Sequence, residues 1–235
     1  MINKNIFYTV IFAIGLFSCT SEKEGTMVVE GTIQGMKKGM LYLQKFQDTA
    51  LVSVDSIFLN GKSTFRLVDN IESPEIYYLT LNQLEKEKID FFGEKGTIII
   101  NTKLEKFGTS AQISGSKIHE TLEEYRKMVR QFQGRNLDII KETFDAQIAK
   151  DDELVDKLNK ESERLLKNRL RYTASFALRN NDSEIAPFLA LTELNNAHIT
   201  LLDTVNNSLS KSVKDSKYGI ALDKYIKDIK KSEAQ

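Results

Sequence analysis

The stretch LVSVDSIFLNGKSTFRLV, residues 51–68, decides how the first half of the chain is expected to fold. Two runs rich in β-branched and aromatic residues, 51–59 and 63–68, flank the dipeptide Asn60-Gly61. Both residues of this dipeptide can adopt positive φ, so Asn-Gly between such runs is a strong short-range signal for a β-hairpin. We therefore predict that the two runs pair with each other in an antiparallel sheet.

Similar runs recur on both sides of this stretch, from Met27 to about Gly115. Further strands are expected at 27–33, 39–46, 75–81, 88–92, 97–102 and 111–114. Segments long enough to form helices do not separate these runs, which argues against a parallel βαβ sheet. Short strands at this spacing predict an antiparallel β-sandwich or barrel of seven or eight strands over residues 27–115.

The hydrophobic period changes after Gly115. Apolar residues then recur every three or four positions, beginning with Ile118, Leu122 and Tyr125, and this spacing is typical of an amphipathic helix. Ser116 is placed to cap the start of that helix. The predicted fold class is therefore α+β, with a helical region over residues 116–235 that follows the β domain.

Polar residues 150–152 interrupt the helical pattern, and a second long helix is expected to begin there, with Leu154 and Leu158 on its apolar face. Two long amphipathic helices joined by a short turn predict an αα-hairpin, with a coiled-coil dimer as the alternative. Shorter helices are expected near 184–195, 198–209 and 216–230. Pro187 must lie in an early turn of its helix, since deeper in the helix it would remove a hydrogen bond.

The first residues of the chain have the character of a targeting segment. Lys4 precedes an apolar run over residues 6–17. Twelve helical residues reach about 18 Å, well short of the roughly 30 Å hydrocarbon core of a bilayer. We therefore interpret residues 1–18 as a secretory signal peptide and not as a transmembrane helix.

The end of this segment, Leu16-Phe17-Ser18-Cys19, resembles the lipobox of bacterial lipoproteins, although Phe17 stands where a small or β-branched residue is usual. The resemblance implies cleavage before Cys19 and acylation of its sulfur and its amine, with residues 19–26 as a tether. A thioether sulfur cannot serve as a redox nucleophile or a metal ligand, since both roles need a thiolate. The alternative is a soluble secreted protein whose only cysteine happens to follow its signal.

The same resemblance predicts where the protein lies. Thr20 occupies the position at which Asp would signal retention in the inner membrane, so we expect an outer-membrane lipoprotein. Its acyl chains would make membrane lipid a partner through Cys19, at the periplasmic face or the cell surface.

Charge excludes one class of partner. The chain has 33 basic and 33 acidic side chains. Removal of residues 1–18 takes away Lys4 and leaves 32 basic and 33 acidic side chains, a net charge of −1. This balance provides no basic field for nucleic acid.

The mature chain also resembles a known arrangement of domains. The likeness is carried by Val29-Glu30-Gly31-Thr32-Ile33, by Asp55-Ser56-Ile57, by the segments 39–43, 60–65 and 72–77, and by further segments at 113–116, 180–183 and 216–222. These segments resemble the N-terminal domain of unknown function that precedes thioredoxin-like disulfide reductase lipoproteins of Bacteroidota. In fuller family members a helix like the one containing Tyr218-Gly219 leads into a thioredoxin domain with a Cys-x-x-Cys pair. This sequence has a single cysteine, so the resemblance implies a fold and a location but not the redox activity.

Few residues suggest catalysis or metal binding. His119 follows Ser116 by one helical turn, but no nucleophile elbow surrounds the serine, and we expect His119 on the helix surface. His198 is expected at the start of a helix, and two histidines this far apart do not predict a metal site. The acidic run 151–153 could bind calcium weakly, but it lacks the spacing of an EF-hand and is better explained as a solvated turn. We predict no cofactor and no enzymatic activity.

Aromatic residues in the predicted strands supply the remaining candidate site. Tyr42, Tyr77 and Tyr78 could form a binding surface, although strand aromatics more often belong to a core. The predicted function is a non-catalytic binding or accessory module of the bacterial envelope, with a protein or peptide partner and an oligomeric state that the sequence does not specify. The alternative is an accessory role in thiol–disulfide exchange, in which the protein docks a separate thioredoxin-like protein.

Overall fold

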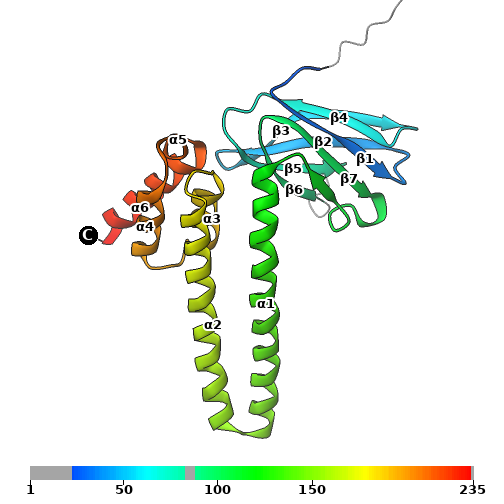
Figure 1. The fold of residues 1–235 in the computed structure, drawn as a ribbon. Helices are drawn as coiled ribbons and strands as arrows, with labels where there is room; N and C mark the ends of the chain where they lie inside the picture. The colour runs from blue at the N-terminus through cyan, green and yellow to red at the C-terminus, as the bar shows by residue number, and fades with distance from the viewer. Residues whose placement is uncertain (1–22, 83–87, 234–235) are drawn as a thin grey trace, which may run out of the picture.

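The structure, a computed structural model, describes residues 23–82 and 88–233 (Figure 1). The predicted signal peptide, the lipobox residues 16–18, Cys19 and the first part of the tether lie outside the described residues.

The N-terminal half is a sandwich of two four-stranded sheets, as predicted. One sheet has the order β4-β1-β7-β8 and the other β3-β2-β5-β6. All neighbouring strands are antiparallel except β1 and β7, which run parallel. The strands are β1 (Met27–Gln34), β2 (Lys38–Gln47), β3 (Ala50–Asn60), β4 (Thr64–Asp69), β5 (Glu75–Leu81), β6 (Lys88–Gly93), β7 (Gly96–Lys103) and β8 (Gln112–Ser114).

The predicted hairpin at Asn60-Gly61 is wrong, because β3 and β4 belong to different sheets. Gly61 does adopt a positive φ of 74°, but its N–H donates to the Lys37 carbonyl, beside β2. Two residues later, the Ser63 carbonyl accepts a hydrogen bond from the N–H of Ile33 in β1. The turn therefore carries the chain from one sheet to the other, and its local sequence does not distinguish the two outcomes.

Asp55 joins the two sheets where β3 and β4 lie at the same edge of the sandwich. Its carboxylate accepts hydrogen bonds from the backbone N–H of Val68 in β4, at 3.0 Å, and from that of Ser56, at 2.8 Å. Lys23 forms an ion pair with the same carboxylate. The Asp55 carboxylate thus satisfies a backbone donor of β4 that has no partner within its own sheet.

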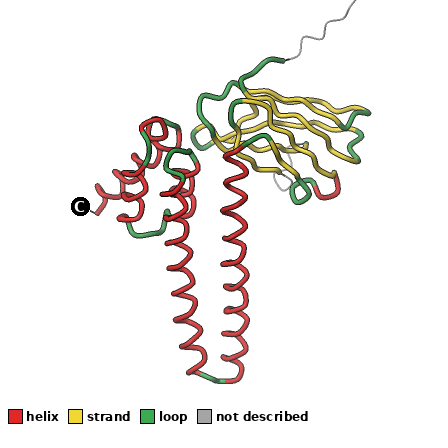
Figure 2. The backbone as a smooth tube through the Cα atoms, viewed as in Figure 1, coloured by secondary structure: helices red, strands yellow, loops and turns green. Residues whose placement is uncertain are grey.

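In the described part of the chain, six α-helices follow the sandwich: α1 (Lys117–Ala149), α2 (Asp152–Arg179), α3 (Ile185–Glu193), α4 (Ile199–Ser208), α5 (Lys211–Lys214) and α6 (Lys217–Glu233). Helices α1 and α2 form the predicted αα-hairpin, whose tip projects away from the sandwich (Figures 1 and 2). Ser116 caps α1 as expected, since its Oγ accepts from the N–H of His119 at 3.1 Å. Pro187 is the third residue of α3. None of the helices within the described ranges is long and apolar enough to cross a membrane.

The helices dock on the outer face of the β3-β2-β5-β6 sheet. Alternate residues of β5 point into the sandwich core, as Tyr77 and Leu79 do, while Ile76 points outward. Ile76 and the fully buried Phe92 pack against Leu122 of α1 and neighbouring side chains of α2 and α3. Strand β5 is therefore covered on both faces.

Two side chains from the helices complete the hydrogen bonding of this sheet. Ile76 lies beyond the last β2–β5 pair, and its N–H donates to the Tyr218 hydroxyl at 3.0 Å. Phe92 lies on the free edge of β6, and its N–H donates to Nδ1 of His119 at 3.4 Å. Since Ile76 and Phe92 are register partners, both acceptors bind the same end of the sheet. We call this arrangement the acceptor pair.

The prediction that His119 lies on the helix surface is wrong, since only 4% of the residue is exposed. The first turn of α1 faces β6 and not solvent, a tertiary arrangement that helix periodicity does not reveal. Burial lowers the pKa of His119, and its contact with the Phe92 N–H needs an unprotonated Nδ1. The folded protein therefore favours the neutral imidazole.

This burial predicts a pH-dependent stability. The pKa of His119 is lower in the folded than in the unfolded chain. The contribution of His119 to the stability of the folded chain is therefore complete above pH ~6.5, the usual pKa of an unfolded histidine, and is lost as the pH falls through the pKa of His119 in the folded chain. We expect the free energy of unfolding, measured with urea, to fall between pH 7 and pH 5 as the buried imidazole is forced to take up a proton. His119→Gln should remove this dependence. The matched control His198→Gln changes the exposed residue that caps α4 and should retain it. An unchanged pH dependence in His119→Gln would contradict this account.

Candidate functional site

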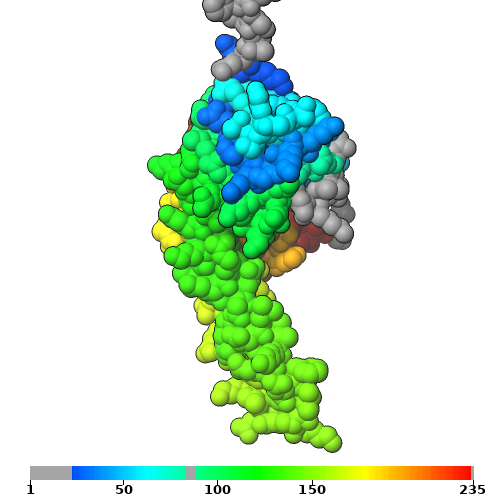
Figure 3. All heavy atoms as spheres, turned by 90° about the vertical axis from the view of Figure 1, so that its right-hand side faces the viewer, coloured from blue at the N-terminus to red at the C-terminus, as the bar shows by residue number. Residues whose placement is uncertain are grey.

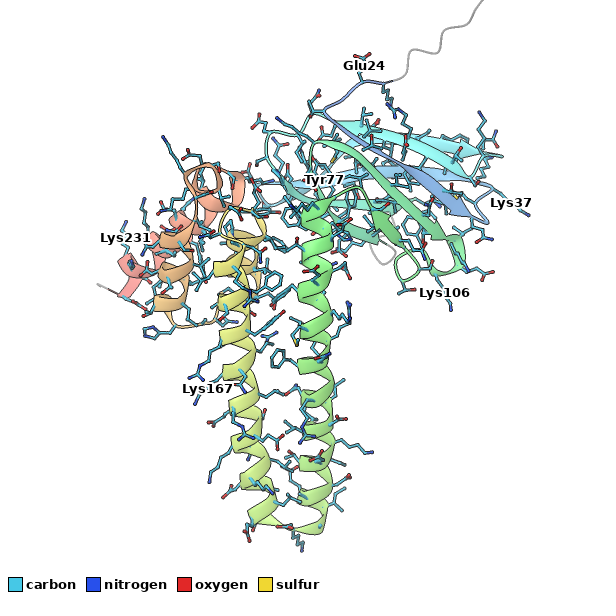
Figure 4. All side chains as sticks on the ribbon, viewed as in Figure 1. Glu24, Lys37, Tyr77, Lys106, Lys167 and Lys231 are labelled. Carbon is cyan, nitrogen blue, oxygen red and sulfur yellow. The ribbon has the colours of Figure 1, made fainter. Side chains whose placement is uncertain are left out.

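A cleft of about 740 Å³ lies where the outer face of the β3-β2-β5-β6 sheet meets α1, α3 and α6. Its volume falls within the range of roughly 300–1,000 Å³ that is typical of ligand sites. Side chains from both halves of the chain gather in this region (Figure 4). The cleft exists because the helices cover one end of the sheet only.

Aromatic rings form the apolar part of the cleft. Phe46 and Tyr78 pack edge to face on the sheet side, with ring centroids 5.7 Å apart. Phe188 and Tyr218 pack on the helix side, with centroids 5.3 Å apart. Burial raises the pKa of both Tyr78 and Tyr218, so their hydroxyl groups stay protonated at neutral pH. The cleft therefore offers ring surfaces from both walls.

Charged groups of both signs surround these rings. The lining contains three basic and three acidic residues, Lys88, Arg126, Lys217, Asp48, Glu75 and Asp90. Arg126 forms an ion pair with Asp90 and a hydrogen bond to Glu123 at 2.9 Å. Burial alone would lower the pKa of Arg126, but these carboxylates outweigh it and raise that pKa. The guanidinium group of Arg126 in α1 is thus fixed against Asp90 in β6.

Lys88 differs from the other two cations. Its Nζ lies 4.7 Å from the centroid of the Tyr78 ring, a cation–π arrangement. It forms no ion pair within the described residues, whereas Lys217 is paired with Glu75 and donates to the Phe46 carbonyl at 2.8 Å. Among the described residues, Lys88 is therefore the basic group of the cleft that a ligand can engage without breaking a salt bridge.

A polar network behind the cleft fixes its wall. Nζ of Lys45 lies 2.8 Å from Asp69 and 3.2 Å from Glu75, and the Tyr77 hydroxyl donates to Asp69 at 2.6 Å. Burial alone would raise the pKa of Asp69, but the hydrogen bonds from Lys45 and Tyr77 outweigh it and keep that pKa below its usual value. Glu75 belongs both to this network and to the cleft, so it couples the sandwich to Lys217 at the start of α6.

The three tyrosines proposed from the sequence occupy different environments. Tyr77 is fully buried in the sandwich core and cannot form part of a binding surface (Figure 4). Tyr78 lines the cleft. Tyr42 is half-buried and is not among the residues that line the cleft. Successive side chains of a strand point to opposite faces of the sheet, so the adjacent residues Tyr77 and Tyr78 of β5 lie in the core and in the cleft, respectively.

Sequence reasoning missed the helix side of the site. Arg126, Phe188 and Tyr218 are brought to the cleft from three helices, and their spacing in the chain does not predict that they meet. The Tyr218-Gly219 motif was the one partial indication in the sequence that Tyr218 belongs to the site. A Cβ at Gly219 would lie 2.0 Å from the carbonyl oxygen of Val213, so only glycine allows the close approach that presents Tyr218 to the sheet.

The other sequence candidates have structural roles. Oγ of Ser116 caps α1, so the spacing of Ser116 and His119 reflects capping. His198 begins α4 as expected, and Asp151 caps α2 by accepting from the N–H of Leu154 at 3.0 Å. Within residues 23–82 and 88–233, no three His, Cys, Asp or Glu side chains are grouped closely enough to hold a metal ion.

Comparison with known families identifies the N-terminal part of the chain. Residues 27–122 match the family model of DUF4369, a domain of unknown function. The match covers all eight strands and continues into α1 as far as Leu122, so it includes His119 and its contact with β6. No curated protein and no solved structure matches the chain.

Proposed function

We propose that the protein is an outer-membrane lipoprotein that binds a peptide segment of another envelope protein in the cleft, without catalysis. The observation that carries this proposal is the cleft itself, in which aromatic rings from both walls lie beside charges of both signs. A peptide supplies apolar side chains for the rings and hydrogen-bonding groups for the polar rim. The balanced charges of the lining do not favour a strongly charged ligand such as a nucleic acid.

Lys88 supports this proposal most specifically. An acidic side chain or a terminal carboxylate of a peptide could pair with its ammonium group while packing against Tyr78. The ion pairs of Arg126 and Lys217 would remain intact, so binding would not cost the contacts that hold the helices on the sheet. A thioredoxin-like protein that presents such a segment is an alternative partner.

Site-specific photo-crosslinking tests the proposal in the membrane-bound protein. With p-benzoylphenylalanine at position 78 we expect a discrete adduct with an envelope protein. Placed at position 42, which is half-buried on the same sheet face but outside the cleft, the probe should give no such adduct. Lys88→Glu should abolish the adduct formed at position 78, since it replaces the cation by an anion.

The matched control is Lys62→Glu, which makes the same charge change at an exposed residue between β3 and β4 and should leave the adduct intact. Equal adducts from positions 42 and 78, or an adduct insensitive to Lys88→Glu, would contradict binding in the cleft. Identification of the adduct by mass spectrometry separates a thioredoxin-like partner from other envelope proteins.

The lipid anchor is tested separately. When residues 1–18 are replaced by a secretory signal peptide that is cleaved without a lipobox and Cys19 is replaced by Ser, the acylated sulfur is lost and the apolar run 6–17 is absent. We expect this variant to leave the membrane fraction after a high-salt wash while its circular dichroism spectrum stays unchanged. Retention of the Cys19→Ser variant in washed membranes would contradict the anchor.

A further inference from the structure

The distal half of α1 carries an exposed apolar face. It consists of Leu137, Ile140, Phe144 and Ile148, whose exposed fractions are 66%, 56%, 62% and 68%. They recur every three or four residues and therefore lie along one side of the helix. We call these four residues the outer stripe.

The outer stripe is separate from the seam that joins α1 to α2. Ile139 and Ala146 of α1 face that seam, where they pack with Leu158 of α2 and are 2–3% exposed. At about 100° per residue, Phe144 lies roughly 140° around the helix from Ile139. Folding of the hairpin therefore leaves the outer stripe uncovered, and Figure 3 shows this side of the hairpin open below the sandwich.

We propose that a second copy of this chain covers the outer stripe, with the two α1 helices antiparallel about a two-fold axis near residue 142. In such a pair Leu137 lies opposite Ile148 of the second copy, and Ile140 lies opposite Phe144 of the second copy. The spacing of the stripe is thus nearly symmetric about its own centre, as a self-complementary interface requires.

The charges beside the stripe favour the same arrangement. Lys141 and Asp145 are exposed, lie on the same flank of the stripe and form no ion pair within the described residues. Residues of the same flank face each other in an antiparallel pair. Lys141 would therefore meet Asp145 of the second copy, and the reverse pair would form by symmetry. In a parallel pair, Lys141 would lie at the same height as Lys141 of the second copy, and Asp145 at the same height as Asp145 of the second copy. Neither Lys141–Asp145 contact would then form.

The other flank is also self-complementary. It carries the exposed amides Asn136 and Gln147, which would lie opposite each other and can exchange hydrogen bonds. Four side chains that each expose on the order of 100 Å² give about 400 Å² per copy. Over both copies this is about 800 Å², below the roughly 1,200–2,000 Å² of a standard interface, so we expect a weak dimer that forms at micromolar concentration. The inference does not depend on the proposed function of the cleft.

Disulfide trapping of the full-length protein in membranes tests the orientation. When a Lys141→Cys chain and a differently tagged Asp145→Cys chain are expressed together, mild oxidation should yield the mixed disulfide dimer in at least a several-fold excess over either like pair. A chain with Lys157→Cys, an exposed position on α2, should not be trapped with Asp145→Cys. Like pairs as abundant as the mixed pair, or no trapped product, would overturn the proposal.

A charge exchange tests the energetics. In sedimentation of the full chain over a concentration series, Lys141→Asp should raise the dissociation constant at least about tenfold, since like charges then meet. The double variant Lys141→Asp, Asp145→Lys should restore the original value. Phe144→Glu should give a monomer with unchanged helical content, because the side chain makes little contact within its own chain. A wild-type chain that stays monomeric at 100 µM, or a double variant as weak as the single one, would overturn the proposal.

Discussion

The docking of helices on one end of the β3-β2-β5-β6 sheet is the constraint on which the rest of the structure depends. Ile76 and Phe92 are register partners whose N–H groups have no strand beside them, and an unpaired buried N–H costs about 1–3 kcal/mol. The acceptor pair of Tyr218 and His119 satisfies both groups. The apolar side chains of the same two strand residues are buried by α1, α2 and α3, so hydrogen bonding and hydrophobic burial act at the same place.

The cleft is a consequence of this docking. Because α1, α3 and α6 converge on the end of the sheet, they leave a hollow beside it in which Tyr78 and Lys88 of the sheet face Phe188 and Tyr218 of the helices. The ion pairs of Arg126 with Asp90 and of Lys217 with Glu75 cross the same boundary. A ligand in the cleft would therefore touch both halves of the chain, and the match of residues 27–122 to one domain family includes only the sheet side and the first turns of α1.

Much of the secondary structure could be predicted from the sequence, since strand and helix periodicities are local. Segments 75–81 and 88–92 correspond closely to β5 and β6, and the polar break at 150–152 is the turn of the αα-hairpin. Pairing is not local. Asn60-Gly61 signals a turn correctly, but hydrogen bonds of Gly61 to Lys37 and of Ser63 to Ile33 decide that it links two sheets. His119 was misplaced for the same reason, because its burial depends on an edge strand that precedes it by some 27 residues.

The candidate site was predictable only in part. Tyr78 was among the residues proposed from the sequence, whereas Arg126, Phe188 and Tyr218 reach the cleft through the packing of separate helices. Alternation along β5 could have separated Tyr77 from Tyr78, but it could not show which face of the sheet lies toward solvent when both faces are buried.

Native-state hydrogen exchange of the Phe92 amide tests the central claim most directly. Phe92 lies on a sheet edge, where an amide exposed to solvent would exchange quickly. If His119 and the helices cover this edge, the Phe92 amide should exchange only with global unfolding, at a rate close to that of Leu79 in the sandwich core. Exchange of Phe92 at the rate of an open strand edge, while Leu79 stays protected, would contradict the account.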